Sequence, residues 1–432
     1  MTEKNRTIGT LGAISIGIGG MVGGGIFAVL GEAVSLAHGA TALAFLFAGI
    51  VALLTAYAYA KLSVTYQSRG GTIVFIDKAF GQNLLSGSVN IMLWLSYLVT
   101  ISLYAVAFAS YAQTFFSPPY PEWLKHLLIS IAILLPMIIN LISASFVSRS
   151  ETLLVVIKIL LLLIIIITSA FYVDLERLSP ALWEGPLSII VAGMIIFVAY
   201  EGFELIANAA EDVKEPNKTL PRAFYGSVIL VIILYILIAI ITTSTVPESQ
   251  LVAAQDYALA VAAQPALGQV GFTMVAIAAL LATFSAINAT IYGNARLGYT
   301  LAKEGTLPKR LAQENHRKIP STDVWVTAGL SLLLANSINL TEIAIIGSAS
   351  FLLIFFIVNI AAYRLRHTIQ ANPYILLTAS FVSGAALFTL LIHTYSTNPR
   401  AIIIFVSFMA ISILFEWSYG TIVRKHLFHR PY

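Results

Sequence analysis

The stretch Gly19-Gly20-Met21-Val22-Gly23-Gly24-Gly25-Ile26-Phe27 decides the fold, because it interrupts the first long apolar segment of the chain. Five of its first seven residues are glycine, and each glycine inside a helix costs about 1 kcal/mol relative to alanine. An uninterrupted helix is therefore not expected here. Close approach of a neighbouring helix, which small residues permit, is the alternative explanation of the glycines.

The composition around this stretch is that of a membrane protein. Of the 432 residues, 59% are hydrophobic and only 10% are charged, and the mean hydropathy is +0.89. Soluble domains average about 45–50% apolar and about 25% charged residues, so a water-soluble protein is excluded. The chain has no cysteine, its histidines follow no metal-ligand spacing, and its basic residues form no stripe. We therefore expect no metal, cofactor or nucleic acid partner.

Apolar windows bounded by charged residues, proline and glycine predict twelve membrane spans. The predicted spans are residues 9–35, 40–66, 84–115, 123–143, 151–172, 186–208, 222–245, 268–295, 321–339, 343–365, 372–394 and 399–420. If the N-terminus is cytoplasmic, 20 of the 24 Lys and Arg residues fall in inner segments and 3 in outer segments. This bias predicts that both termini lie in the cytoplasm, and the short loops and tails indicate a plasma (inner) membrane.

A second interruption is predicted five spans later, in Phe197-Val198-Ala199-Tyr200-Glu201-Gly202-Phe203-Glu204, where a glycine lies between two carboxylates. Interrupted helices at matching places in two halves indicate a transporter site near the membrane midplane. Unwound backbone is tolerated at that depth only against protein or a water-filled cavity. Free N–H groups at a half-helix N-terminus attract an anion, and free carbonyl groups attract a cation. An α-amino acid carries one of each.

Four stretches, taken in order, resemble signatures of the amino acid–polyamine–organocation (APC) permeases: 21–27, 57–81, 202–223 and 288–308. The resemblance is greatest to prokaryotic, proton-coupled members of broad specificity. It implies an all-α polytopic membrane protein, with twelve transmembrane helices in a single membrane domain, 1–432. It also implies a 5+5 inverted repeat (LeuT-like) with discontinuous helices 1 and 6. The repeats are then 9–172 and 186–365, followed by two extra helices over 372–420.

The resemblance also implies that a substrate binds between spans 1, 3, 6, 8 and 10. Backbone groups on the two interruptions then hold the parts that all amino acids share. The substrate carboxylate is expected on the N–H groups near Gly24, Gly25 and Ile26. The amino group is expected on the carbonyl groups of Met21, Val198 and Glu201.

Lys158 is the only Lys or Arg in the interior of a predicted span, away from its ends. An ionisable group at that depth usually faces a cavity or a partner, and a side chain that extends to the membrane surface is the alternative explanation. The resemblance implies proton coupling, because proton-coupled members of the family carry a lysine here, near the place of the ion in sodium-coupled relatives. Its expected partners are a carbonyl group near Gly19 or Gly20 and the hydroxyl of Ser285.

The second interruption offers side chains as well as backbone. Glu204 resembles a carboxylate in span 6 of several family members, whereas close relatives more often have a small or apolar residue at the position of Glu201. Either carboxylate can face a cationic substrate or act as a second proton site, and a solvated cavity wall is a third explanation. Phe203 is a candidate aromatic gate, although aromatic residues in spans more often pack in the core.

The leading hypothesis is a secondary active amino acid transporter that is proton-coupled, sodium-independent and works by alternating access. The alternatives are an amino acid exchanger and a permease for cationic amino acids or amines. A non-transporting nutrient sensor with the same fold is a weaker alternative. No protease, zinc or nucleotide-binding motif occurs in the sequence, so we do not expect an enzyme. The sequence leaves open whether the protein is a monomer or a homodimer.

Overall fold

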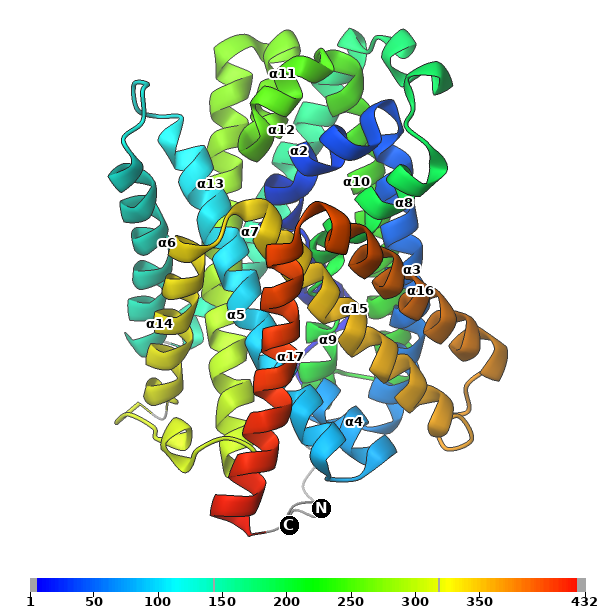
Figure 1. The fold of residues 1–432 in the computed structure, drawn as a ribbon, viewed down its shortest axis with the longest axis vertical. Helices are drawn as coiled ribbons and strands as arrows, with labels where there is room; N and C mark the ends of the chain where they lie inside the picture. Colours follow the sequence, from blue (N-terminus) through cyan, green and yellow to red (C-terminus); the bar gives the residue numbers. More distant parts are fainter. Residues whose placement is uncertain (1–5, 143, 318, 426–432) are drawn as a thin grey trace.

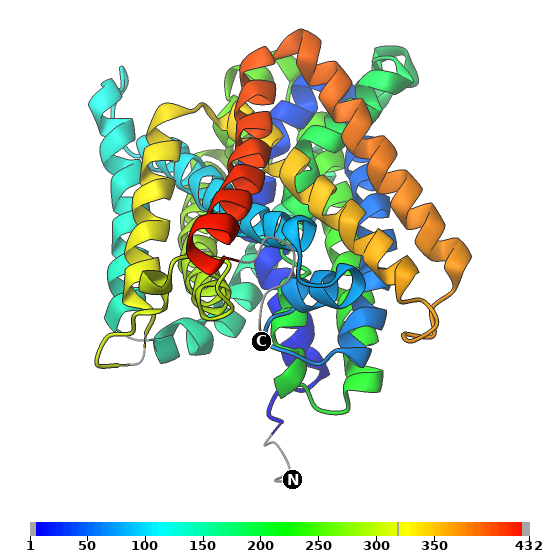
Figure 2. The ribbon, with the colours of Figure 1, turned by 60° about the horizontal axis from the view of Figure 1, so that its bottom comes forward.

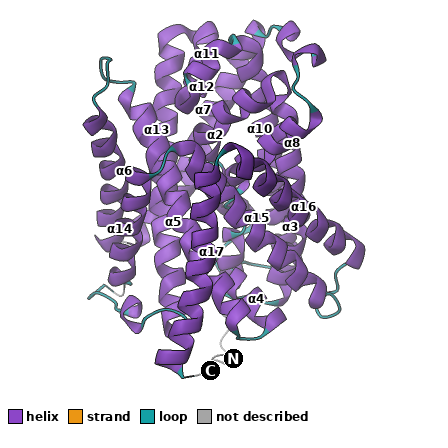
Figure 3. Cartoon of the chain, viewed as in Figure 1, coloured by secondary structure: helices purple, strands orange, loops and turns teal. Residues whose placement is uncertain are grey.

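A computed structural model describes residues 6–142, 144–317 and 319–425, and over 144–152 it describes the backbone only. Most of this chain is helical, as Figure 3 shows. The single β-bridge among the described residues joins Ile8 to Val213. The predicted all-α class is therefore confirmed.

The helices follow one another with short connections. They are α1 Thr10–Met21, α2 Gly25–Ala37, α3 Thr41–Thr65, α4 Thr72–Phe80, α5 Leu84–Gln113, α6 Glu122–Ile142, α7 Ala144–Ser169, α8 Pro186–Ile195, α9 Leu205–Asn208, α10 Pro216–Thr245, α11 Glu248–Ala253, α12 Ala258–Ala262, α13 Gln264–Lys303, α14 Ser321–Ser337, α15 Leu340–Arg364, α16 Pro373–Thr397 and α17 Pro399–Tyr419. Short 3-10 helices used below are η5 Ile196–Tyr200, η7 Gln255–Tyr257 and η8 Lys309–Ala312.

Helix is present at every one of the twelve predicted spans, but several boundaries differ. Ten segments of the described chain are long and apolar enough to cross a membrane, with α2 and α3 counted together as Gly25–Thr65. The number twelve and the inverted repeat remain predictions. The fifth predicted span begins at residue 151, whereas the helix begins at Ala144. The eighth ends at 295, whereas α13 continues to Lys303, because polar helix ends extend beyond the apolar window.

Both interruptions are present. The first predicted span divides into α1, which ends at Met21, and α2, which begins at Gly25. The sixth divides into α8 with η5, a turn over 201–204, and the single-turn helix α9. The discontinuous helices predicted from glycine density and from the carboxylates are therefore found where the sequence placed them.

The helices form one bundle, and Figures 1 and 2 show that the described chain begins and ends at the same end of it. Arg6 donates to Gln67 there at 2.7 Å, and α4 lies across this end in Figure 1. α16 and α17 lie at the periphery and expose large apolar side chains such as Phe381 and Ile403. Such a surface suits contact with lipid.

Candidate functional site

The two interruptions lie directly against each other. A Cβ added at Gly20 would lie 2.6 Å from the carbonyl oxygen of Gly202, and one added at Gly25 would lie 2.6 Å from the Cα of Ala199. Gly202 has a φ of +119°, a conformation that residues with a side chain rarely adopt. Close approach thus requires glycine at Gly20 and Gly25, and the backbone angle adds a second reason at Gly202.

Tyr235 of α10 joins the two interruptions. Its Oη lies 2.7 Å from the carbonyl oxygen of Met21 and 3.1 Å from that of Ala199, so its hydroxyl can donate to either one. The buried ring meets that of Tyr200 edge to face, with centroids 5.2 Å apart. One side chain can therefore donate a hydrogen bond to a carbonyl group of either interruption, and it fixes the spacing between the two interruptions.

The N–H groups of Gly24, Gly25 and Ile26 precede or begin α2 and make no hydrogen bond within the described residues. The first N–H groups of a helix have no partner inside it, and all three residues are buried. Gly24 packs directly against the ring of Tyr104 on α5, and a Cβ added there would lie 3.1 Å from Thr283 on α13. A buried unpaired donor costs about 1–3 kcal/mol, so these three donors favour an anion.

The carboxyl groups of the second interruption each meet a tyrosine of α5. The hydroxyl of Tyr97 donates to Oε1 of Glu204 at 3.1 Å, and that of Tyr104 donates to Oε2 of Glu201 at 3.3 Å. The N–H of Gly202 donates to Oε2 of Glu204 at 2.8 Å. Both glutamates are at most 2% exposed, and their carboxyl groups interact with each other. Two buried like charges are strongly unfavourable, so a shared proton or a cation is needed to neutralise them.

Val198 and Phe203 are held by contacts on other faces of the second break. The N–H of Val198 donates to Oγ of Ser348 on α15 at 2.9 Å. The buried ring of Phe203 packs against those of Phe355 and Tyr59, with centroids 5.2 Å and 5.6 Å apart. Phe203 thus lies in an aromatic cluster, and a role as a gate stays a prediction.

Lys158 lies in α7 and is only 2% exposed, so protein covers its side chain. α7 packs against both α1 and α13. These are the helices that carry the expected partners Gly19, Gly20 and Ser285. The packing brings the right elements together, and the individual contacts of the ammonium group stay a prediction.

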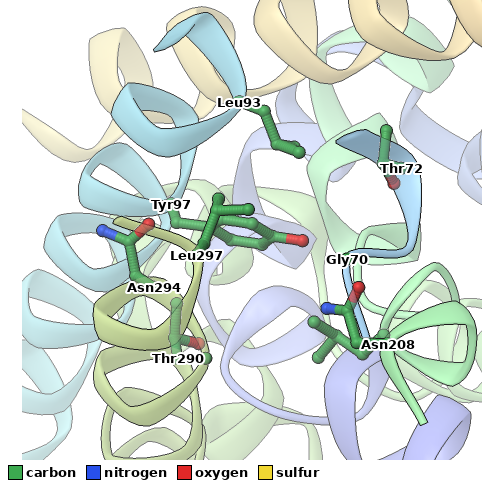
Figure 4. A pocket seen from close by; sticks show the side chains of 10 residues that line it. Gly70, Thr72, Leu93, Tyr97, Asn208, Thr290, Asn294 and Leu297 are labelled. Atoms are coloured by element: carbon green, nitrogen blue, oxygen red, sulfur yellow. The ribbon is translucent and has the colours of Figure 1, made fainter. Parts of the chain in front are cut away.

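A pocket that we call the vestibule lies near the carboxyl pair, toward the end of the bundle where α4 lies in Figure 1. It is lined by Gly70, Thr72, Leu93, Tyr97, Leu205, Asn208, Thr290, Gly293, Asn294 and Leu297. In Figure 4, Tyr97, Thr290 and Asn294 lie on one side of it and Thr72 and Asn208 on the other, with the ring of Tyr97 pointing across. Because Tyr97 also donates to Glu204, the vestibule ends one hydrogen bond away from the buried carboxyl pair.

The opposite end of the bundle is closed by side-chain contacts. α11 and α12 lie at this end together with α2, as Figure 1 shows. Gln255 and Thr341 both donate to Oε2 of Glu32, at 2.9 Å and 3.0 Å. Ser110 donates to Asp256 at 2.8 Å. α2, α5, η7 and α15 are thus tied together on the side of the breaks away from the vestibule.

Sequence reasoning missed Tyr104, Tyr235 and Ser348. Each lies in an uninterrupted apolar helix, where the local pattern indicates an ordinary span. A hydroxyl group inside spans 3 and 10, which the resemblance places at the site, could have pointed to Tyr104 and Ser348. No such signal exists for Tyr235, because helix α10, which is the seventh predicted span, was not expected near the substrate.

Comparison with known proteins gives the family. The family model described as amino acid permease matches residues 8–418. The chain is 35% identical to the inner membrane transport protein YbaT of Escherichia coli, over 95% of each chain. It is 26% identical to the methylthioribose transporter of Bacillus subtilis, over 98% of this chain and 94% of that one. It is 24% identical to the branched-chain amino acid permease BcaP of the same organism, over 84% and 81% of the two chains. The chain therefore belongs to the amino acid permease family of the APC superfamily, and it is a transporter rather than an enzyme.

Proposed function

We propose that this protein is a proton-coupled, sodium-independent secondary active transporter of amino acids that works by alternating access. The observation that carries the proposal is the contact between the two interruptions. On one side of that contact lie the free N–H groups of Gly24, Gly25 and Ile26. On the other side lie carbonyl groups and the buried pair Glu201 and Glu204.

In this proposal the substrate carboxylate binds the free N–H groups at the start of α2, where the helix dipole favours an anion. The amino group binds carbonyl groups of Met21, Val198 and Glu201. The carbonyl of Met21 already accepts from Tyr235, and that of Val198 accepts from the N–H of Glu201 at 3.2 Å. A carbonyl oxygen has two lone pairs, so each can still accept from an ammonium group.

The membrane arrangement of the proposal has twelve spans, a 5+5 inverted repeat over 9–172 and 186–365, and two further helices over 372–420. Its support is the position of helix at each predicted span and the single interruption in each half. Both described ends of the chain lie at one end of the bundle, as an even number of spans requires. The distribution of Lys and Arg favours the cytoplasm of a plasma (inner) membrane for that end.

Lys158 carries the coupling proton in this proposal. Lys158 is buried in α7, and ionisable groups at membrane depth commonly form part of proton pathways. Protonated Lys158 would hold α7 against α1 and α13, close to the first interruption, and deprotonation would loosen these helices. Proton binding and the position of the first interruption are then coupled through packing.

The second candidate is a permease for cationic amino acids or amines, and the buried pair Glu201 and Glu204 favours it. A cationic side chain would neutralise this pair as a proton does. An exchanger that uses the same site is the third possibility. A non-transporting sensor with the same fold is a fourth.

The experiment is uptake of labelled amino acids into proteoliposomes that contain the purified protein. The arms impose an inward proton gradient, an inward sodium gradient, neither gradient, or internal amino acid alone. Accumulation driven by protons and indifferent to sodium is the expected result. Uptake that requires internal amino acid would make the protein an exchanger, and sodium-driven uptake would overturn the role of Lys158.

A further inference from the structure

A buried acid outside the two interruptions takes no part in the steps above. Asp323 lies in the first turn of α14 and is fully buried. Its carboxyl oxygens make no hydrogen bond of good geometry within the described residues, although the indole of Trp94 on α5 lies within reach. Toward α13, the carboxyl group packs so closely on Gly298 that a Cβ there would overlap it. The acid therefore lies between three helices.

The described chain supplies no cation to this acid. α14 packs against α5, α6, α13 and η8. Toward the end of the bundle where α14 begins, the titratable or charged groups that these elements carry include Tyr97, Arg296, Lys303, Lys309 and Arg310. Arg296 stacks on Tyr292 and Lys303 on Tyr299. None of them forms an ion pair with Asp323 among the described residues, and Lys318 lies outside those residues.

Magnitudes decide which form of the acid this packing suits. Burying an unpaired carboxylate costs several kcal/mol. The N-terminus of a helix such as α14 stabilises a negative charge by about 0.3–1 kcal/mol, and by about 2 kcal/mol in a favourable partly buried geometry. The uncharged acid therefore fits this closely packed interface, and ionisation requires water to enter between α13 and α14.

This interface lies directly behind one wall of the vestibule. Asn294 and Leu297 line the vestibule, and both are within about one helical turn of Gly298 on α13. Asn294 also donates to Thr327 of α14 at 3.2 Å, so the wall is attached to α14 beside the acid. Separation of α13 from α14 would move that wall.

We propose that Asp323 is a proton-binding residue that positions α13 and thereby sets how far the vestibule opens. With its proton, the acid lets α5, α13 and α14 pack closely, and the vestibule stays narrow. When the proton passes to water, solvent enters behind α13 and the vestibule widens. The transport rate then responds to the pH on the side that the vestibule faces, a consequence that rests on the proposed function.

The test uses the absence of cysteine from the chain and needs neither substrate nor gradient. Thr290→Cys places one thiol in the vestibule, and Ser396→Cys places one on the exposed opposite end. Each purified full-length protein is labelled with a water-soluble maleimide at several pH values. The ratio of the two labelling rates removes most of the intrinsic pH dependence of the thiol. The same pair of cysteines is then measured with Asp323→Asn, which keeps the shape of the acid and removes its charge.

We expect the ratio to rise about tenfold between about pH 6 and about pH 9 in the parent and to stay flat with Asp323→Asn. Gly298→Ala pushes α13 from the carboxyl group, so labelling of Thr290→Cys should be fast at every pH. A flat ratio in the parent, or an equal rise with Asp323→Asn, would overturn the proposal. If Asp323→Asn yields no folded protein, Gly298→Ala provides the test instead. A labelling profile of Gly298→Ala that equals that of the parent would also contradict the proposal. A failure of proton-driven uptake would leave these labelling results unaffected, so the two proposals are separable.

Discussion

The two interruptions break a helix in different ways. The first, over 19–25, relies on glycine, and what it presents for binding is backbone. The second, over 196–204, is a 3-10 segment followed by a turn, and it adds two buried carboxyl groups with tyrosine partners. Under the proposed function, backbone groups of both breaks bind what every amino acid has. Selection among substrates and proton states then falls to the second break and to the helices around both.

The largest effect is expected where the two breaks touch. Gly202→Ala places a Cβ against the backbone of Gly20 and forces alanine into a φ of +119°. Strain of this kind costs about 1–3 kcal/mol, and the overlap adds to it, so we expect loss of folded protein or of all transport. Size-exclusion profiles and thermal unfolding report the outcome.

Gly329→Ala on α14 is the matched control, because a Cβ there meets nothing within 4 Å. A helical glycine replaced by alanine gains about 1 kcal/mol, so this variant should unfold at or above the temperature of the parent. Equal behaviour of the two variants would mean that the breaks do not depend on each other.

Lys158, whose helix packs against α1 and α13, should matter next. Lys158→Met keeps most of the side-chain volume and removes the charge, so we expect proton-driven accumulation to be lost while exchange continues. Uptake into proteoliposomes with and without a proton gradient measures this. Full pH-driven uptake by Lys158→Met would assign the lysine a structural role and leave proton coupling to the second break.

Replacing Glu201 should distinguish one class of substrate from another, whereas replacing Glu204 should affect all substrates. If Glu201 faces a cationic side chain, Glu201→Gln should lower uptake of lysine and arginine about tenfold, equivalent to about 1.4 kcal/mol, and spare neutral amino acids. Glu204→Gln changes the residue that accepts a hydrogen bond from the N–H of Gly202, so we expect it to slow the transport of every substrate. A uniform loss with Glu201→Gln would instead favour a proton site.

A smaller effect is expected at the side chain that joins the breaks. Tyr235→Phe removes a hydroxyl that lies against carbonyl groups of both breaks. A hydrogen bond contributes about 0.5–1.5 kcal/mol net, so apparent affinity should fall about two- to tenfold. Tyr225→Phe is the control, since Tyr225 lies on the same helix without a hydrogen bond to either break. Equal affinities in the two variants would remove Tyr235 from the site.

The sequence allowed prediction of the helical membrane class and of both interruptions, because these follow from local composition. Hydropathy identifies a helix that lipid can surround, and clustered glycines identify a place where helix is costly. The roles of Tyr235 and Asp323 could not be predicted. Their contacts join different helices, and an apolar helix gives no signal for which face meets which neighbour. Asp323 has the local sequence context of an ordinary acid in a first helical turn, and its burial emerges only from the packing of α5, α13 and α14.

The central claim is that the amino acid binds where the two breaks touch, and a structure with bound amino acid tests it most directly. The account predicts the substrate carboxylate within hydrogen-bonding distance of the N–H groups of Gly24, Gly25 and Ile26. It also predicts the amino group against carbonyl groups of both breaks, with Tyr104 displaced from Gly24. A substrate held in the vestibule between Thr72, Asn208 and Thr290, with the breaks still packed on each other, would contradict it.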